Sequence, residues 1–281
     1  MPFTLEKTGL EESRIQRLLN SAGELLRTLG WAGPNGQFYQ GETKKFQEVV
    51  GFSSHIFKTA PELLKEGKER LICLDCSCGK SYLAFVLNYL LREMYGLKVT
   101  FYGVDTSPLL IQRCKAMATH LGYENMSFWQ GKTQEFEPPS NVDIVLALHA
   151  CDTATDEAIA KGIQLGARYI MVVPCCQNQI RGQIRSPQPL ERLTEFGLLR
   201  YRFADLLTEA IRAQVLRGAG YYVEMHEIVP PTVTPKNLVL TARKTRSGKK
   251  GVEGYKELSS LLGVRSPLEG LLPGLFGGDK D

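Results

Sequence analysis

The chain of 281 residues carries 34 basic and 30 acidic side chains, 43% hydrophobic residues and seven cysteines. This composition suits one large globular domain with extensions, or two small domains. It excludes a membrane-spanning protein, because no apolar run is long enough to cross a bilayer. The net charge of +4 permits a polyanionic partner without requiring one. Because the amino terminus lacks a signal-peptide pattern and the cysteines lack the spacing of a secreted scaffold, we expect a cytoplasmic protein with reduced thiols and no membrane partner.

The first residues of the chain predict helices rather than strands. Apolar positions recur at helical spacing between Glu6 and Arg27 and again between Lys44 and Lys58, with a Gly- and Pro-rich loop between them. We therefore expect a helical amino-terminal extension over residues 1–66.

From Leu71 onward the pattern changes to short apolar runs that alternate with helical segments. The runs begin at Leu71, Lys98, Met126, Val142 and Ala167 and predict five buried strands, followed by a helix over Phe203–Gly218. Two further strands, 221–229 and 237–243, are separated by a Pro-rich turn too short for a crossover helix, so they must pair as an antiparallel hairpin. The predicted fold is an α/β, Rossmann-like one, with a seven-stranded, mostly parallel sheet and a terminal antiparallel hairpin.

The turn after the first strand, Asp75-Cys-Ser-Cys-Gly-Lys-Ser, is typical of a nucleotide-binding βαβ unit. A phosphate loop would need glycine at the position of Leu74, and a dinucleotide fingerprint would need three glycines where only Gly79 stands. A ligand without phosphates fits better. S-adenosylmethionine (SAM) offers an ammonium group for Asp75 and ribose hydroxyls for Asp105, which ends the second strand. The alternatives are a helix cap for Asp75 and an ordinary turn residue for Asp105.

Four sequence blocks carry a family resemblance: Asp75–Leu83, Gly103–Asp105, Leu146–Ala158 and Val173–Gln177. Together they resemble a little-characterised family of class I SAM-dependent methyltransferases. The His149–Asp156 block and the paired cysteines are also similar to the eukaryotic tRNA acceptor-stem 2′-O-methyltransferases, and to methyltransferase-like proteins and a glutathione-transferase-like fusion in humans. Ser77 and Ser81 depart from the family pattern, which often has glycine there. Gln177-Asn178 replaces the two histidines of the tRNA enzymes.

The resemblance and the strand ends together predict the site. The predicted cofactor-binding residues are Asp75, Cys76, Ser77, Cys78, Gly79, Lys80, Tyr82, Asp105, Thr106, Lys132, Thr133 and His149. The predicted catalytic residues are His149, Asp152, Cys175 and Cys176. His149 would remove a proton from a hydroxyl acceptor, although it could also be a buried structural histidine. Asp152 would orient His149 or the acceptor, or else cap the following helix.

The cysteines after strands one, four and five admit three interpretations. Small side chains that shape the pocket are the simplest one. A zinc or iron–sulfur site is geometrically conceivable, but Cys76, Cys78, Cys151, Cys175 and Cys176 contain no Cys-x-x-Cys pair among themselves and we assign no metal. A covalent cysteine nucleophile, as in enzymes that methylate a pyrimidine ring carbon, lacks the proline expected before the first cysteine.

An arginine-rich segment at 180–202 reads as an insertion after strand five. Arg181 and Arg185 are the predicted substrate-binding residues, because a basic rim suits RNA phosphates.

We expect a methyltransferase domain over residues 67–244 and a basic, then apolar, tail over 245–281. RNA is the leading substrate hypothesis, with methylation at a ribose hydroxyl or a base. The rivals are a small-molecule or protein methyltransferase, a catalytically inactive binding protein on the same fold, and a metal or redox protein. The oligomeric state stays open.

Overall fold

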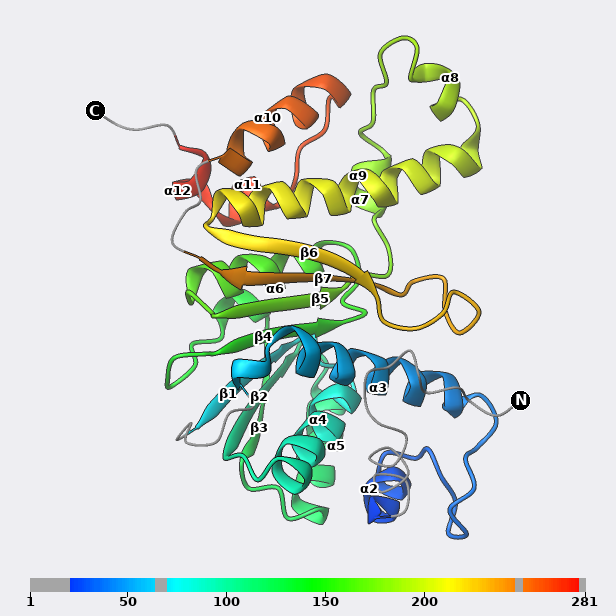
Figure 1. Cartoon of the computed structure of the whole chain (residues 1–281), viewed down its shortest axis with the longest axis vertical. Helices are drawn as coiled ribbons and strands as arrows, with labels where there is room; N and C mark the ends of the chain where they lie inside the picture. The colour runs from blue at the N-terminus through cyan, green and yellow to red at the C-terminus, as the bar shows by residue number, and fades with distance from the viewer. Residues whose placement is uncertain (1–20, 64–69, 246–249, 278–281) are drawn as a thin grey trace. The chain divides into compact units, whose positions relative to one another are not determined.

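The computed structural model describes residues 21–63, 70–245 and 250–277. Seven strands form one sheet in the order β3-β2-β1-β4-β5-β7-β6 (Figure 1). They are β1 Leu71–Cys76, β2 Val99–Asp105, β3 Met126–Gln130, β4 Ile144–Leu148, β5 Tyr169–Val173, β6 Tyr221–Glu227 and β7 Leu238–Lys244. β1 pairs with β2, β2 with β3, and β4 with β5 in parallel, whereas β5 and β7 are antiparallel. The predicted fold class is confirmed.

The chain divides into two compact units. The first is Met1–Asp143 with His226–Val239, and the second is Ile144–Met225 with Leu240–Asp281. None of the helices in the described part of the chain is both long and apolar enough to cross a membrane.

The first unit contains the predicted helical extension and the first three strands. Its helices are α2 Gly23–Thr28, α3 Glu42–Thr59, α4 Tyr82–Tyr89 with a π-helical continuation Leu90–Met94, and α5 Pro108–His120, with 3₁₀ turns at Pro61–Leu63 and Thr133–Glu135. Most of the helix predicted over 6–27 lies outside the described residues. The helix predicted over 44–58 is confirmed as α3.

Close packing explains how α3 joins this unit. Gly51 lies at the middle of α3, where a Cβ atom would stand 2.5 Å from the carbonyl oxygen of Ile228. Only glycine permits that approach. The ring of Trp31 is fully buried and lies 5.8 Å from that of Phe46 on α3 and 4.9 Å from that of Tyr82 at the start of α4. The extension is therefore part of the core beside the first βα turn.

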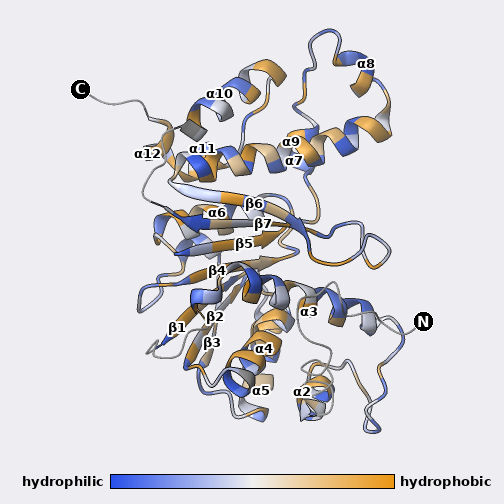
Figure 2. Ribbon diagram, in the orientation of Figure 1, coloured by the Kyte–Doolittle hydropathy of each residue, from blue (hydrophilic) through white to orange (hydrophobic). Residues whose placement is uncertain are grey.

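The second unit holds β4, β5 and the carboxyl-terminal helices. These are α6 Thr153–Gln164, α7 Asn178–Arg181, α8 Glu191–Thr194, α9 Gly197–Gly218, α10 Lys250–Leu262, α11 Leu268–Leu271 and α12 Pro273–Phe276. The residues of β4 from Ile144 to Ala147 are fully buried, and the core strands are strongly hydrophobic in Figure 2. Figure 1 shows α10 lying along α9, and the two helices are in contact.

The helix predicted over Phe203–Gly218 starts earlier than expected. α9 begins at Gly197, within the arginine-rich segment, and α7 and α8 precede it. The reason is that the first turns of α9 expose apolar side chains. Leu198 is 67% exposed, so the segment shows none of the one-sided periodicity by which a packed helix is detected in a sequence.

Candidate active site

The turn that links β1 to α4 has an unusual backbone. Ser77, Gly79 and Ser81 have φ values of 53°, 57° and 53°. Glycine adopts this left-handed region freely, whereas a serine there is strained. A Cβ atom built on Gly79 would meet nothing within 4 Å. The turn therefore presents an open backbone surface at the carboxyl end of β1.

Asp75 lies beneath this turn and is only 2% exposed. Its Oδ2 accepts a hydrogen bond of 2.8 Å from the hydroxyl of Ser81. Burial raises the pKa of Asp75 to about 7, the hydrogen bond from Ser81 opposes this rise, and the negative charge of Asp105 adds to it. A cationic ligand near Asp75 would favour the charged carboxylate and lower this pKa.

Asp105 connects the loops that follow the three strands of the first unit. Its Oδ2 accepts a hydrogen bond of 2.8 Å from the amide of Gly79, and its Oδ1 accepts one of 2.9 Å from Ser107. Its main-chain carbonyl accepts from the amide of Gly131, 3.0 Å away. The half-buried carboxylate is thus held in place, while each oxygen keeps a further lone pair for a ligand hydroxyl.

The other predicted cofactor residues of the first unit flank these two aspartates. Lys80 lies with its ammonium 5.7 Å from the ring centroid of Tyr82. Thr106 and Lys132 are exposed, Thr133 is buried at the start of its 3₁₀ turn, and the Cys76 side chain is buried within β1. The loops after β1, β2 and β3 therefore carry exposed polar groups around one hydrogen-bonded centre.

The thiols of Cys78 and Cys114 support the same turn. Cys114 donates to the carbonyl of Gly79 at 3.4 Å, and Cys78 lies 4.0 Å from that oxygen. The interaction with Cys114, followed by burial, raises the pKa of Cys78. A thiol with a raised pKa is poorly nucleophilic, so Cys78 is not a candidate nucleophile, and Cys114 supports the turn through its hydrogen bond to Gly79.

In the second unit the ends of β4 and β5 run side by side. The amide of His149 donates to the carbonyl of Val173 at 2.8 Å, and that of Asp152 donates to the carbonyl of Cys176 at 3.2 Å. His149 and Asp152 have φ values of 58° and 52°. With Ser77 and Ser81 they are the non-glycine residues of positive φ in the described part of the chain, and all four follow β1 or β4.

Three thiols gather at these two strand ends. The sulfur atoms of Cys151 and Cys175 are 3.0 Å apart, and those of Cys175 and Cys176 are 3.9 Å apart. Burial and the neighbouring thiols raise the pKa of Cys175, and burial raises that of Cys176. A raised pKa favours the protonated thiol, which disfavours the covalent-nucleophile hypothesis for Cys175 and Cys176.

The predicted substrate residues lie on the surface of α7 and the loop after it. Arg181 and Arg185 are both exposed. The guanidinium carbon of Arg181 stands 5.4 Å from the ring centroid of Tyr201. The predicted catalytic residues lie at the ends of β4 and β5 in the same unit.

Comparisons with known proteins identify the domain. Residues 44–183, from α3 to just beyond α7, match the family model described as a methyltransferase domain. The chain carries a methyltransferase domain. The matched segment contains every predicted cofactor-binding and catalytic residue.

The curated relatives are much longer proteins. The glutathione S-transferase C-terminal domain-containing protein of Mus musculus is 26% identical over 199 residues, which are 62% of this chain and 30% of the relative. The Homo sapiens protein of that name is 25% identical over 188 residues, 58% of this chain and 28% of the relative. The chain thus spans less than a third of these relatives.

Similar solved structures include two methyltransferases. An rRNA methylase from Streptococcus thermophilus is 15% identical with a TM-score of 0.43, covering 68% of this chain and 96% of its own. A magnesium protoporphyrin IX methyltransferase from Synechocystis, crystallised with SAH, is 16% identical with a TM-score of 0.45, covering 84% of this chain and 100% of its own.

The residues of the first unit fit the cofactor of a methyltransferase. The open backbone at Gly79 leaves room for a ligand to approach closely. A cation facing the buried Asp75 would stabilise its charged carboxylate, and the oriented carboxylate of Asp105 can accept hydrogen bonds from hydroxyl groups. SAM carries the ammonium, sulfonium and ribose groups that these three features suit. When bound, it supplies an activated methyl group.

One hollow of the first unit lies away from this site. It is lined by residues of α5, of the loop that follows α5 and of β3, among them Lys115, Tyr123 and Met126. Met126 opens β3, and β3 is parallel to β2, so this hollow lies at the opposite end of the strands from Asp105.

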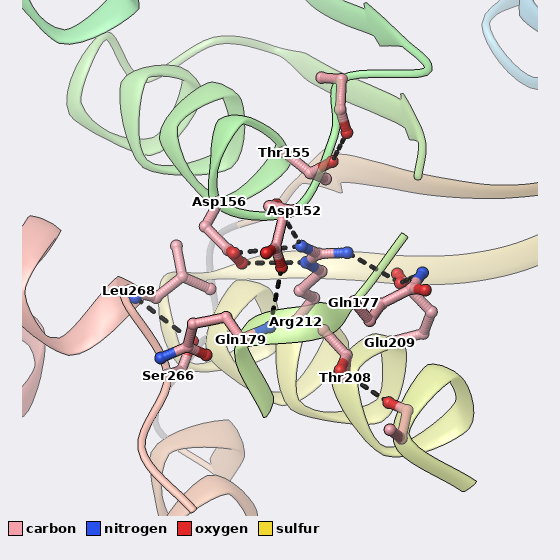
Figure 3. A network of polar contacts seen from close by, with 12 residues as sticks. Asp152, Thr155, Asp156, Gln177, Gln179, Thr208, Glu209, Arg212, Ser266 and Leu268 are labelled. Atoms are coloured by element: carbon pink, nitrogen blue, oxygen red, sulfur yellow. Dashed lines mark hydrogen bonds and ion pairs between the residues drawn. The ribbon is translucent and has the colours of Figure 1, made fainter. Parts of the chain in front are cut away.

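Sequence reasoning missed a buried ionic network in the second unit (Figure 3). The guanidinium of Arg212, on α9, is fully buried and contacts Asp156 through two nitrogens at 2.9 and 3.1 Å. It also donates to Glu209 at 2.8 Å and to the main-chain carbonyl of Asp152 at 2.9 Å. Burial alone would lower the pKa of Arg212, but Glu209 and Asp156 raise it.

This network places the loop after β4. Asp152 does not cap α6 with its side chain. Its Oδ1 instead accepts from the amide of Gln179 in α7, at 3.1 Å. Asp152 is therefore tied to α9 through its carbonyl and to α7 through its carboxylate. The sequence does show two acidic residues, Asp152 and Asp156, one helical turn apart. No local pattern around Arg212 indicates that its side chain is buried.

Proposed function

We propose that this methyltransferase acts on RNA, transferring the methyl group of SAM to a ribose hydroxyl or a base. The observation that carries the methyl-transfer part is the pair of aspartates at adjacent strand ends, Asp75 and Asp105, joined through the turn of Gly79. This arrangement offers a charge for an ammonium and two oriented oxygens for a ribose.

The RNA part of the proposal rests on the surface of α7–α9. Arg181, Arg185 and Arg202 are exposed, and none of them takes part in the ion pairs formed among the described residues. Arg192 is different, because its guanidinium lies 3.9 Å from Glu195. Phe196 is 58% exposed close to these arginines in the chain. Exposed guanidinium groups with an exposed aromatic ring suit phosphates and unstacked bases.

The chemistry that this proposal requires is an in-line displacement. A lone pair of the acceptor attacks the methyl carbon, the carbon–sulfur bond breaks, and S-adenosylhomocysteine (SAH) leaves with the bonding electrons. A hydroxyl acceptor must also lose its proton. His149 is the proposed base, because it stands in the loop that directly follows the carboxyl end of β4 and carries an imidazole that can accept a proton. Asp152 positions the same loop.

Calorimetric titration with SAM and SAH tests the cofactor, and transfer of a labelled methyl group tests the acceptor. We expect micromolar binding and label in the RNA fraction of a total cell extract, sensitive to ribonuclease. Label in the protein or small-molecule fraction would overturn the RNA assignment. Absence of binding to either ligand would favour a binding protein on an inactive methyltransferase fold.

A charge-reversed variant sharpens the RNA test. Arg181→Glu with Arg185→Glu should weaken RNA binding and reduce its dependence on salt, because each lost phosphate contact lowers the slope of log K against log salt by about 0.7 for single strands. Arg113→Glu, at an exposed position of α5, is the matched control. Equal RNA affinity of the two variants would remove Arg181 and Arg185 from the interface.

A further inference from the structure

Cys151, Cys175 and Cys176 form a compact thiol cluster at the ends of β4 and β5. Their three sulfur atoms all lie within 4.8 Å of one another. Cys151 comes from the loop after β4, and the other two follow β5, so residues 24 and 25 positions apart in the chain meet here. The tertiary fold, rather than one local turn, brings these three cysteines together.

The backbone on both sides of the cluster is held by hydrogen bonds. His149 donates to Val173 on one side of Cys151, and Asp152 donates to Cys176 on the other. The carbonyl of His149 also lies 3.8 and 3.7 Å from the sulfur atoms of Cys151 and Cys175. The three thiols are therefore presented by a preformed frame, which lowers the ordering cost of binding a ligand between them.

The spacing of the sulfur atoms suits a thiophilic metal ion. A tetrahedral zinc ion with bonds of about 2.3 Å to thiolate sulfur holds two such atoms about 3.8 Å apart. Cys175 and Cys176 already stand 3.9 Å apart. The 3.0 Å between Cys151 and Cys175 would have to widen by less than about 1 Å. Cys151 is exposed, so its side chain has room to move and an ion has a path from solvent.

We propose that these three cysteines bind a soft divalent cation, with Zn²⁺ as the representative ion. The three thiols release their protons to solvent as the metal–sulfur bonds form. Three protein ligands leave one tetrahedral position for water or an acceptor atom, which is the pattern of catalytic rather than structural zinc. The site revises our sequence-based assignment of no metal, and it does not depend on the RNA proposal.

A disulfide between Cys151 and Cys175 is the competing interpretation. Their sulfur atoms would need to approach from 3.0 Å to about 2.05 Å, and the bond would leave Cys176 without a role. The presence of a third thiol within 4.8 Å of both favours the metal. The two interpretations differ for the reduced chain: a metal site binds Zn²⁺, whereas a redox pair binds no Zn²⁺ and forms a disulfide when it is oxidised.

The first test uses the full chain, reduced and stripped of metal with a chelator. Titration with Co²⁺ should produce a sulfur-to-cobalt charge-transfer band that saturates at one ion per chain and disappears when one equivalent of Zn²⁺ is added. Zn²⁺ should also protect Cys151, Cys175 and Cys176 from alkylation, as read by peptide mass spectrometry. No thiolate band and no protection would overturn the proposal.

Single substitutions locate the site. Cys151→Ser, Cys175→Ser and Cys176→Ser should each weaken Zn²⁺ binding by at least tenfold. Cys114→Ser is the matched control, because it removes a thiol outside the cluster and keeps a donor for Gly79. Undiminished binding in all three cluster variants would overturn the assignment. So would a reduced chain that binds no Zn²⁺ but forms a Cys151–Cys175 disulfide under mild oxidation. SAM binding, measured in parallel, reports separately on the cofactor site.

Discussion

The hydroxyl of Ser81 donates a 2.8 Å hydrogen bond to Oδ2 of Asp75. Both residues are buried, and Ser81 has a φ of 53°, where glycine would be the unstrained choice. The serine at this position therefore donates a hydrogen bond to a buried carboxylate, while its own backbone is strained. Such strained residues cluster at functional sites, where the surrounding structure holds them in place.

Asp75 should make stability depend on pH. Its pKa is raised from 3.8 to about 7 in the folded chain. The folded state therefore binds more protons than the unfolded state in that window, and the free energy of unfolding falls as pH rises from about 4 to about 7, by up to about 1.4 kcal/mol per pH unit. Above that range the contribution is constant. Asp75→Asn should flatten the profile, as measured by urea unfolding at several pH values.

The control for this prediction is Ser81→Ala. Loss of the hydroxyl removes the interaction that lowers the pKa of Asp75, so the falling part of the profile should extend to higher pH. Parallel profiles for the parent chain and Asp75→Asn would contradict the raised pKa.

Asp105→Ala should abolish SAM binding while leaving the fold intact. The substitution removes the acceptors of the Gly79 and Ser107 amides, so we also expect a loss of about 1–3 kcal/mol in the free energy of unfolding. Calorimetry with SAM measures the first effect, and urea unfolding measures the second. Glu124→Ala, an exposed acidic residue before β3, is the control. Unchanged SAM affinity in Asp105→Ala would exclude the carboxylate from the cofactor site.

Ser77→Gly should stabilise the fold. A left-handed backbone conformation destabilises a non-glycine residue by about 1–2 kcal/mol. Glycine loses more conformational entropy on folding, which offsets about 0.5–1 kcal/mol of the gain from relieved strain. We expect a net gain of up to about 1.5 kcal/mol and SAM affinity at least equal to that of the parent chain. Ser77→Ala keeps the Cβ atom and serves as the control. A glycine variant less stable than the alanine variant would show that the hydroxyl matters more than the strain.

Arg212→Met should destabilise the second unit severely. It leaves Asp156 and Glu209 as buried carboxyl groups without their guanidinium partner, and breaking such a pair costs about 3–5 kcal/mol. Arg217→Met, at an exposed position of the same helix, should change stability by less than about 0.5 kcal/mol. Thermal and urea unfolding compare the two. Equal effects would mean that the buried network contributes little.

His149→Asn should retain SAM binding and lose methyl transfer to a hydroxyl acceptor. Asparagine is the suitable replacement because it tolerates the φ of 58° at this position and removes the imidazole. Calorimetry and labelled methyl transfer separate the two functions. Full activity in the variant would leave His149 a structural role only.

Local patterns predicted the helices and strands of the core well. The helix over Pro108–His120 has its expected limits, because Ser107 caps its first turn and proline starts it. The start of α9 was placed too late, because the exposed Leu198 breaks the amphipathic pattern. The predicted residues Asp75 and Asp105 do share one hydrogen-bonded turn, while their ligand contacts stay a prediction.

The sequence by itself determined the fold class and showed which polar residues follow the strand ends. It could do so because apolar runs and turn residues act over a few neighbouring positions. Tertiary structure decided the rest. The burial of Arg212 depends on Asp156, 56 residues away, and the meeting of Cys151 with Cys175 depends on β4 pairing with β5. Such contacts arise only when distant segments pack together, and no local pattern encodes which buried charge or thiol will find its partner.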